Sequence, residues 1–553
     1  MIERLKTLLA NIVWFVACLP GWVRFWIGLL FFKQCQTRLI LRLIRENRDT
    51  RFGKEHHFDR IRDLAGFQAL PLIQFKDIEP YIERIRRGEL KQLCSEPILL
   101  LEPTSGSTSG TKWIPYTHTL KKEFQNAIDP WIASLYMRYP GLFAGKHYWS
   151  VSPNTAVKSE QASAVPMGFD TDTEYLGNMQ KRLLECLMAV PSEVSRIRDP
   201  HAFEYVTLLF LLRQKDLRLI SIWHPTFLLI LLQRLPGFYQ RLLRDIRQGI
   251  LDESLELNPR VRKNLCAVLS PLPERARTLA DIDVLNKNQI QQIWPRLVVI
   301  SCWMDGDVAK TGLELAAYFP NASIQGKGLI ATEGIVSIPF GENGSVCAVH
   351  SHGVEFFDPQ TGMALFGWQV QKGKEYFVVL TTGGGLYRYQ LRDRVRITGF
   401  MRATPCFVFV GKEDLISDLV GEKLHERFVA GILKRLETEQ EILCRFAMIA
   451  PWQNWERRGY RLFIQPVSAT TFDADRVAAW VERELCRNYH YQHARNLGQL
   501  QPLDVMVLSG DARSAYLNYY EQRGIKRGDI KFFALGKELN WTSTLKPLEN
   551  SKY

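Results

Sequence analysis

The stretch from Thr104 to Lys112 reads Thr-Ser-Gly-Ser-Thr-Ser-Gly-Thr-Lys, and it is the most informative segment of the chain. A short apolar run over 96–101 precedes it, so the sequence predicts a strand that leads into a loop. The two glycines allow the backbone to approach a ligand closely, and the hydroxyls, N–H groups and closing lysine can donate to phosphate oxygens. Their spacing is not that of a Walker A loop. We therefore expect this loop to hold phosphate, with a flexible Ser/Gly linker as the alternative.

Outward from this loop, the pattern of apolar residues predicts a mixed α/β protein. Helical spacing covers 38–88, 116–140 and 176–250, and Pro225 is expected to begin a new helix. Beyond Trp294 the chain turns to short β-rich runs, at 297–302, 323–330, 344–357 and 375–382. Helices and strands alternate again after 407–411. We expect a large multi-sheet domain of residues 1–411 and a smaller mobile α/β domain of residues 412–553.

Composition excludes several classes of protein. The 553 residues are 46% hydrophobic and 23% charged, which is typical of a folded protein. The net charge of +13 comes from scattered residues, so we expect no nucleic-acid partner. The ten cysteines form no close pairs, which indicates reduced thiols in a cytoplasmic protein. We also expect the protein to be a monomer. His350 and His352 are a possible metal pair, but no third ligand lies nearby in sequence and structural roles are favoured.

The amino terminus is apolar over residues 8–19 and again over 22–32, with Pro20 between the two runs. Neither run alone reaches the roughly 20 residues that span a bilayer. We expect residues 1–35 to form a helical extension packed on the catalytic body. The alternative is a peripheral membrane contact through residues 8–32, with aromatic anchors at Trp14, Trp22, Phe25 and Trp26.

The loop and the segments around it resemble the Gretchen Hagen family of acyl acid amido synthetases, within the luciferase-like adenylate-forming superfamily. The loop is similar to that superfamily's phosphate-binding signature, with Ser109 in place of a glycine and Thr111 in place of a proline. The resemblance continues in the family's order over most of the chain. The segments that carry it are Asn47–Thr50, Phe67, Leu70–Leu72, Tyr81–Ile85, Gly88–Glu89, Ile114–Thr117, Ile293–Pro295, Gly326–Gly334, Val354–Phe356, Leu380–Val395, Phe407–Gly411 and Gly421–Lys423.

This resemblance implies an ATP- and Mg²⁺-dependent ligase. Such an enzyme forms an acyl-adenylate from a carboxylic acid, releases pyrophosphate, and passes the acyl group to an amino acid or another amine. The implied phosphate-binding residues are Thr104, Ser105, Gly106, Ser107, Thr108 and Lys112. Of these, Lys112 is also expected to take part in catalysis.

Two further segments complete the implied nucleotide site. Thr332 and Glu333 match a motif that lines adenine and the α-phosphate, and Glu333 is the implied catalytic residue and metal ligand; Leu329 replaces that motif's tyrosine. Asp393 matches a ribose-binding aspartate, and Arg392, where glycine is usual, adds a cation that can face phosphate. Tyr387 and Arg388 are expected to pack beneath the site.

Three lysines near or beyond the presumed domain junction are further candidates. Lys412 is the implied hinge, Lys423 a contact to carboxylate or phosphate, and Lys531 a catalytic cation between the ATP phosphates and the attacking carboxylate. Two other functions stay open from the sequence. One is an acyl-CoA ligase with a thiol acceptor, and the other is a degenerate paralogue that binds nucleotide without catalysis.

Overall fold

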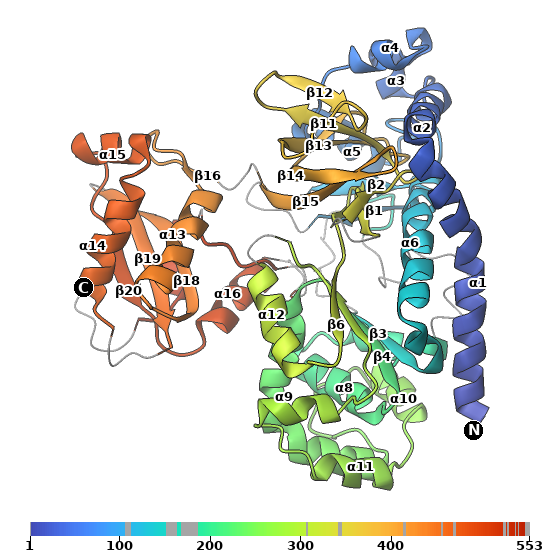
Figure 1. Cartoon of the computed structure of the whole chain (residues 1–553), viewed down its shortest axis with the longest axis vertical. Coiled ribbons are helices and arrows are strands. Elements are labelled where there is room, and N and C mark those ends of the chain that lie inside the picture. Colours follow the sequence, from blue (N-terminus) through green and yellow to red (C-terminus); the bar gives the residue numbers. More distant parts are fainter. Residues whose placement is uncertain are drawn as a thin grey trace. The chain divides into compact units, whose positions relative to one another are not determined.

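The computed structural model of the chain (Figure 1) falls into two compact units, which divide at Gly411. Each unit has its own hydrophobic core and is described by itself. The described residues are 2–104, 112–150, 163–167, 186–305, 308–340, 345–412, 416–454, 457–467, 472–523, 527, 530–536, 538–539 and 541–547.

The first unit contains a four-stranded parallel sheet in the order β3-β4-β5-β6. Parallel neighbours require crossover connections, and helices supply them here. Helices α8 and α9 contact one another and build a second apolar core beside this sheet. The bounds are β3 Lys146–Trp149, α8 Pro200–Arg213, β4 Leu217–Ser221, α9 Pro225–Gln248, β5 Val299–Cys302, α12 Val308–Tyr318 and β6 Ser323–Gly326.

Pro225 begins α9 as expected, and the preceding His224 side chain accepts a hydrogen bond from the Thr226 N–H. Strand β4 corrects the prediction of continuous helix over 176–250, as far as that range is described. Four of its five residues are buried. A strand covered on both faces shows no alternation of apolar and polar residues, so its sequence looks like part of a buried helix.

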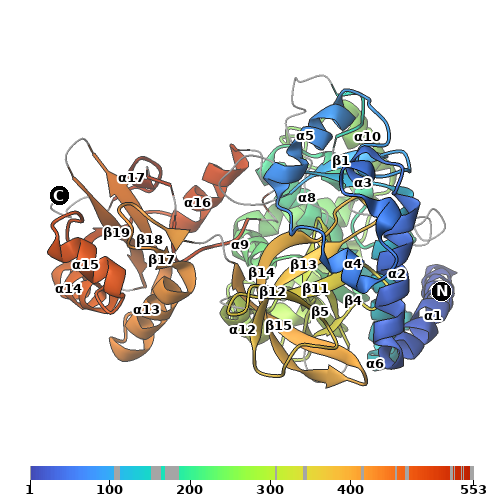
Figure 2. The same ribbon diagram turned by 90° about the horizontal axis from the view of Figure 1, so that it is seen from above.

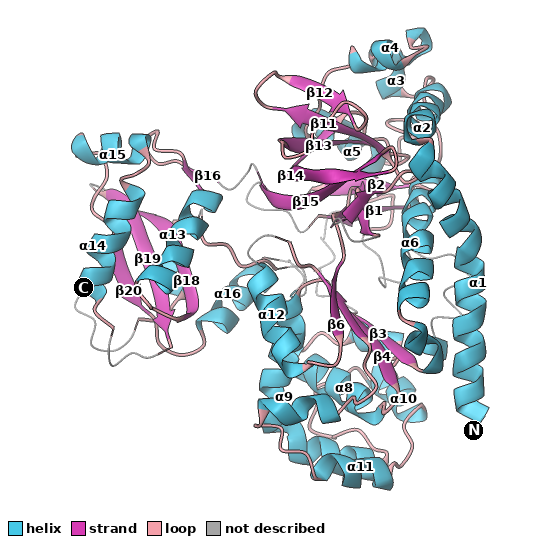
Figure 3. Ribbon diagram, in the orientation of Figure 1, coloured by secondary structure: helices cyan, strands magenta, loops and turns pink. Residues whose placement is uncertain are grey.

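A seven-stranded sheet in the order β12-β11-β13-β14-β15-β10-β9 forms the other half of this unit (Figure 3). The pairs β12–β11, β11–β13, β13–β14, β15–β10 and β10–β9 are antiparallel. These strands include the β-rich runs expected at 344–357 and 375–382. The bounds are β9 Ser337–Pro339, β10 Ser345–Cys347, β11 Gly353–Asp358, β12 Met363–Phe366, β13 Glu375–Thr381, β14 Tyr389–Met401 and β15 Thr404–Lys412.

The amino terminus forms one helix, α1 (Ile2–Leu30), which runs through Pro20 and is followed by α2 (Phe32–Glu46). Pro20, which lies between the two apolar runs of the sequence, therefore does not end the helix. A proline removes one helical hydrogen bond, and packing of the helix against α6 (His118–Arg138) offsets that loss. Figures 1 and 2 both show α1 along the outer edge of the unit with α6 beside it.

Close packing fixes α1 on α6. A Cβ at Gly21 would lie 2.6 Å from Cβ of Asp129, so glycine permits the two helices to approach. Nearby, Asn11 is fully buried, and its side chain donates to the carbonyls of Phe143 and Gly145, both at 3.1 Å. The inner face of α1 is therefore part of the body, as expected for a helical extension packed on it.

The second unit is a smaller α/β body around the strand order β18-β19-β20. β18 and β19 pair antiparallel, whereas β19 and β20 pair parallel. Helices α13 and α14 pack on one another over this core. The bounds are α13 Glu426–Glu439, β18 Cys444–Gln453, β19 Arg458–Pro466, α14 Ala474–Leu485, α15 Tyr489–Asn496, β20 Asp504–Val507 and α16 Ala512–Glu521.

Candidate nucleotide and acyl-transfer site

The phosphate-binding candidate is the loop of a two-stranded hairpin. Strands β1 (Leu100–Pro103) and β2 (Trp113–Tyr116) pair antiparallel, and the Thr104 N–H donates to the Lys112 carbonyl at 2.9 Å where the loop closes. The Thr104 hydroxyl is buried and makes no hydrogen bond within the described part of the chain. Such an orphaned polar group suits a loop that binds an anion. Ser105, Gly106, Ser107 and Thr108 lie outside the described residues.

Thr332 and Glu333 form the two-residue turn between β7 (Ile330–Ala331) and β8 (Gly334–Ile335). The hydroxyl of Tyr116, on strand β2, donates to the Thr332 carbonyl at 2.6 Å. The turn is thereby tied to the strand that follows the candidate phosphate loop. Glu333 is 8% exposed, and Leu329 belongs to the apolar core of the unit.

Asp393 lies on β14 at an irregularity in the pairing with β13. Phe377 stands opposite Arg394 and Val379 opposite Gln390, so β14 has extra residues at this point and forms a bulge. Arg392 has φ of 61°, the left-handed conformation that glycine adopts most easily. The glycine-like geometry is therefore kept although arginine occupies the position. The Arg392 guanidinium donates to Gln74 Oε1 at 2.8 Å, and Asp393 is 2% exposed.

Tyr116 and Thr117, at the end of β2, connect the three segments expected to bind the nucleotide. Tyr116 reaches Thr332, as described above, and the Thr117 hydroxyl donates to the Gly383 carbonyl at 2.9 Å, at the turn before the segment that carries Asp393. A Cβ at Gly384 would lie 2.6 Å from the Pro115 carbonyl oxygen, so this turn packs tightly on β2. The fold thus links the candidate phosphate, adenine and ribose segments of the first unit.

A buried acid–histidine pair supports the same region, and nothing in the sequence pattern identifies Glu123 as the partner of His352. His352 Nδ1 lies 3.0 Å from Glu123 Oε2, and its Nε2 accepts from the Ile335 N–H. Nδ1 therefore carries the proton and donates to the carboxylate. The same carboxylate oxygen accepts from the Gly383 N–H at 2.8 Å. His352 has a structural role, as favoured from sequence, while the nearby His350 contacts the Arg24 carbonyl.

Tyr387 and Arg388 pack beneath this region. The guanidinium of Arg388 forms two hydrogen bonds with the carboxylate of Glu355, both 3.0 Å, in the interior. Burial raises the pKa of Glu355, although Arg388 acts in the opposite direction. The Tyr387 hydroxyl donates to the Leu93 carbonyl. Both residues therefore support the backbone near the site.

The three lysine candidates belong to the second unit. Lys412 ends β15, and Lys423 is exposed beside the buried Glu422. The Lys531 carbonyl accepts from the hydroxyl of Tyr516 on α16. Their roles toward a nucleotide stay predictions.

No cluster of three metal-ligating side chains occurs among the described residues. Mg²⁺ is commonly held by one or two carboxylates together with substrate phosphates, so a single buried carboxylate beside a phosphate loop fits such a site. Glu333, on the turn that Tyr116 ties to β2, is a buried carboxylate of this kind.

Comparison with known proteins agrees with these features. Family models match as the GH3 family N-terminal domain over residues 32–324, the GH3 family central domain over 348–412 and the GH3 family C-terminal domain over 428–538. The indole-3-acetic acid-amido synthetase GH3.8 of Oryza sativa subsp. indica is 24% identical over 549 residues, which cover 90% of this chain and 87% of the relative. The jasmonoyl–L-amino acid synthetase JAR4 of Nicotiana attenuata is 23% identical over 71% of each chain.

A solved structure shares the fold. The AtGH3.15 acyl acid amido synthetase in complex with 2,4-DB superimposes with a TM-score of 0.81 at 19% sequence identity, over 96% of each chain.

Proposed function

The chain belongs to the GH3 family, and from this membership and the site's geometry we propose that it is an ATP-dependent acyl acid amido synthetase. It activates a carboxylic acid as the acyl-adenylate and transfers the acyl group to the amine of an amino acid. The observation that carries the proposal is the hydrogen-bonded connection of the Thr104–Lys112 hairpin with the turn at Thr332–Glu333 through Tyr116. The ten cysteines are all free thiols, which suits a cytoplasmic enzyme.

Two half-reactions follow. In the first, a carboxylate oxygen of the acid attacks the α-phosphorus of ATP, and the bond to the β-phosphate oxygen breaks to release pyrophosphate. In the second, the neutral amine attacks the acyl carbon, the amine loses a proton, and AMP leaves with the bridging oxygen. The mixed anhydride is reactive enough that orientation and exclusion of water are the main tasks of the protein.

The residues are assigned roles by their chemistry. Lys112 and the loop's donors hold the phosphates, and Asp393 accepts hydrogen bonds from the ribose hydroxyls. Glu333 would hold Mg²⁺, and the ion would neutralise negative charge on the phosphates. Thr332 lines the nucleotide, and Arg392 adds positive charge near it.

The second unit is proposed to rotate between the two half-reactions, with the pivot at Lys412. In this proposal Lys531 contacts the ATP phosphates and the acid carboxylate during adenylation, and Lys423 binds substrate carboxylate or phosphate. The division of the chain at Gly411 supports this choice of pivot.

The test of the function asks which product forms. A panel of aryl, indolyl and fatty acids is first screened by ATP–pyrophosphate exchange, and the best acid is then incubated with ATP and either pooled amino acids or CoA. We expect an amide by mass spectrometry and no thioester. A thioester without any amide would contradict the amine acceptor but leave adenylation standing, and absence of exchange with every acid would favour a non-catalytic paralogue.

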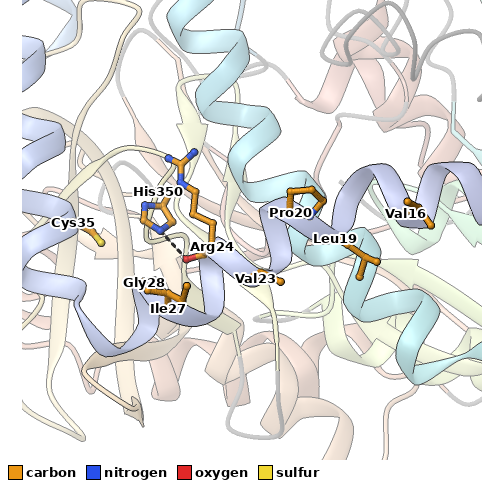
Figure 4. A pocket seen from close by; sticks show the side chains of 9 residues that line it. All are labelled: Val16, Leu19, Pro20, Val23, Arg24, Ile27, Gly28, Cys35 and His350. Atoms are coloured by element: carbon orange, nitrogen blue, oxygen red, sulfur yellow. Dashed lines mark hydrogen bonds between the residues drawn. The ribbon is translucent and has the colours of Figure 1, made fainter.

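We also propose a peripheral membrane contact through α1. By length and composition α1 is apolar enough to span a bilayer, yet its inner face packs on the body. The outward residues of α1 from Leu8 to Leu30, and Phe31 directly after it, are apolar except for Arg24. Figure 4 shows part of this face, where α1 borders His350. A long apolar face on a surface helix is typical of contact with the lipid interface. The exposed side chains are Leu5, Leu8, Leu9, Ile12, Val13, Val16, Val23, Ile27, Leu30 and Phe31.

This arrangement changes which residues are the anchors. Trp14 and Phe25, which the membrane alternative named as anchors, are 1% and 0% exposed and belong to the core, whereas Trp22 and Trp26 are partly buried. The aliphatic side chains of the opposite face take that role. Exposed basic residues, Arg4 and Lys33, lie toward the two ends of the face and suit anionic headgroups.

The protein is expected to sediment with vesicles that contain anionic phosphatidylglycerol, and a variant with Leu9, Val16 and Ile27 each changed to aspartate is expected to stay in solution. A variant with three exposed apolar residues elsewhere, Leu90, Leu285 and Leu313, changed in the same way is the control. Equal sedimentation of both variants would contradict the proposal. A wild-type dimer that the α1 changes dissociate, without vesicle binding, would instead assign the face to a second copy.

A further inference from the structure

Lys327 is a buried lysine enclosed by tryptophans. Its side chain follows β6 by one residue and is 5% exposed. The ammonium lies 4.7 Å from the ring centre of Trp131, 5.5 Å from that of Trp223 and 5.7 Å from that of Trp149. Its one hydrogen bond within the described residues goes to Ser221 Oγ at 2.6 Å.

The surroundings of this ammonium contain no acidic partner among the described residues. The titratable group that affects it is the Cys302 thiol, whose own pKa is raised to about 12 by burial. Burial also lowers the pKa of Lys327 to about 7. The aromatic faces and one hydroxyl compensate only part of the cost of burying this charge. A core position could be filled at lower cost by an apolar residue, so the lysine requires another explanation.

The position of Lys327 in the fold is one where ligands bind. Trp149, Ser221 and Gln325 stand in register at the carboxyl ends of β3, β4 and β6. Ligands of open parallel α/β sheets bind outside this edge. Lys327 also lies in the same segment as Thr332, five residues before the turn assigned to the nucleotide.

Lys327 and the tryptophans around it, here called the enclosure, fit an anion that carries a flat apolar group. An ammonium with unused hydrogen-bonding capacity pairs with a carboxylate, and indole rings contact an aromatic or alicyclic group. The indole N–H of Trp149 is buried and makes no hydrogen bond with described residues, so it is a further donor beside the lysine. A protonated amine would be repelled, which disfavours the amino group of the acceptor.

We propose that Lys327, with Trp131, Trp149 and Trp223, binds the carboxylate of the acyl acid, and that this acid carries a flat ring. The inference rests on the proposed function, because it names the substrate class of that site. The α-carboxylate of an amino acid acceptor could bind Lys327 in the same way. The two carboxylates can be distinguished because the acid takes part in the first half-reaction and the amino acid only in the second.

The test compares Lys327→Met with Lys287→Met. Lys287 lies 4.3 Å from the ring centre of Tyr318, so the control also removes a lysine from an aromatic contact. In ATP–pyrophosphate exchange with indole-3-acetate and with benzoate, Lys327→Met is expected to raise KM for the acid at least about tenfold, as loss of a charged hydrogen bond implies. The KM for ATP should be unchanged in Lys327→Met. In the control variant Lys287→Met, the KM for the acid should also be unchanged. Thermal melting verifies that both variants are folded.

A second measurement is independent of catalysis. At pH 8 the free amine of Lys327 is mostly neutral, because its pKa is about 7. A bound carboxylate favours the charged form, so binding of the acid should take up close to one proton, measured by calorimetry in two buffers of different ionisation enthalpy. The Lys327→Met variant should take up none, and Ser221→Ala, which removes the hydrogen-bond partner, should change the uptake while retaining binding.

The outcomes separate the inference from the proposed function. Exchange activity with an unaltered acid KM and unaltered proton uptake in Lys327→Met would overturn the inference and leave the function standing. Proton-linked binding of an acid without any exchange would support the inference and contradict the function. An increase confined to the amino acid KM in the complete reaction would assign the enclosure to the acceptor and overturn its assignment to the acid.

Discussion

Replacing Lys112 by alanine is expected to lower the rate of acyl-adenylate formation about a hundredfold while leaving the fold intact, since loss of one preorganised charge costs roughly 3 kcal/mol in the transition state. The Lys112 side chain forms no ion pair with described residues. What closes the hairpin is its backbone carbonyl, which accepts from the Thr104 N–H and is unaffected by the substitution. The structural cost should therefore be small.

The measurement for Lys112→Ala is pyrophosphate exchange at saturating acid and ATP, with a melting curve of the same preparation. Lys122→Ala is a matched control, because Lys122 is an exposed lysine on α6, the helix after the hairpin. A near-normal exchange rate in Lys112→Ala would remove the loop from the mechanism. A lowered melting temperature in that variant alone would show that the side chain stabilises the fold instead.

Sequence patterns correctly predicted the helix starts and strands that are determined by neighbouring residues. The proline after His224 marked the start of α9, and most of the β-rich runs beyond Trp294 are strands. Turn residues and proline constrain the backbone directly, so they act without knowledge of distant contacts. The family's motifs also indicated a large multi-sheet α/β domain followed by a smaller α/β domain, and the solved GH3 structure shares this chain's fold.

Long-range packing explains what local patterns missed. Pro20 lies inside α1 because contacts with α6, more than a hundred residues away, stabilise a continuous helix. The polarity of Glu123 gave no sign that it receives His352 and the Gly383 N–H in the interior. The sequence around Lys327 does not indicate that three tryptophans from distant segments surround its side chain. Arg392 shows that a residue other than glycine adopts a left-handed conformation where the surrounding strands impose it.

Replacing Glu333 by glutamine is expected to lower kcat about a hundredfold and to raise the Mg²⁺ concentration needed for half-maximal exchange. Asp393→Asn should instead raise KM for ATP about tenfold with little change in kcat. The contrast follows from the assigned roles. Charge neutralisation by a metal held at Glu333 matters most as the phosphorus is attacked, whereas hydrogen bonds to ribose are equally strong before and during the reaction.

Both substitutions keep the size of buried side chains, which limits structural damage at positions 8% and 2% exposed. The Thr332 carbonyl and Tyr116 hold the turn at Glu333, and β14 pairs with β13 on both sides of the bulge at Asp393, so these main-chain contacts remain in both variants. Exchange rates are measured over a matrix of ATP and Mg²⁺ concentrations. If the two variants showed the same dependence on both, the division between metal binding and ribose binding would be wrong. If Asp393→Asn alone changed the Mg²⁺ requirement, the metal would belong to β14 rather than to the turn after β7.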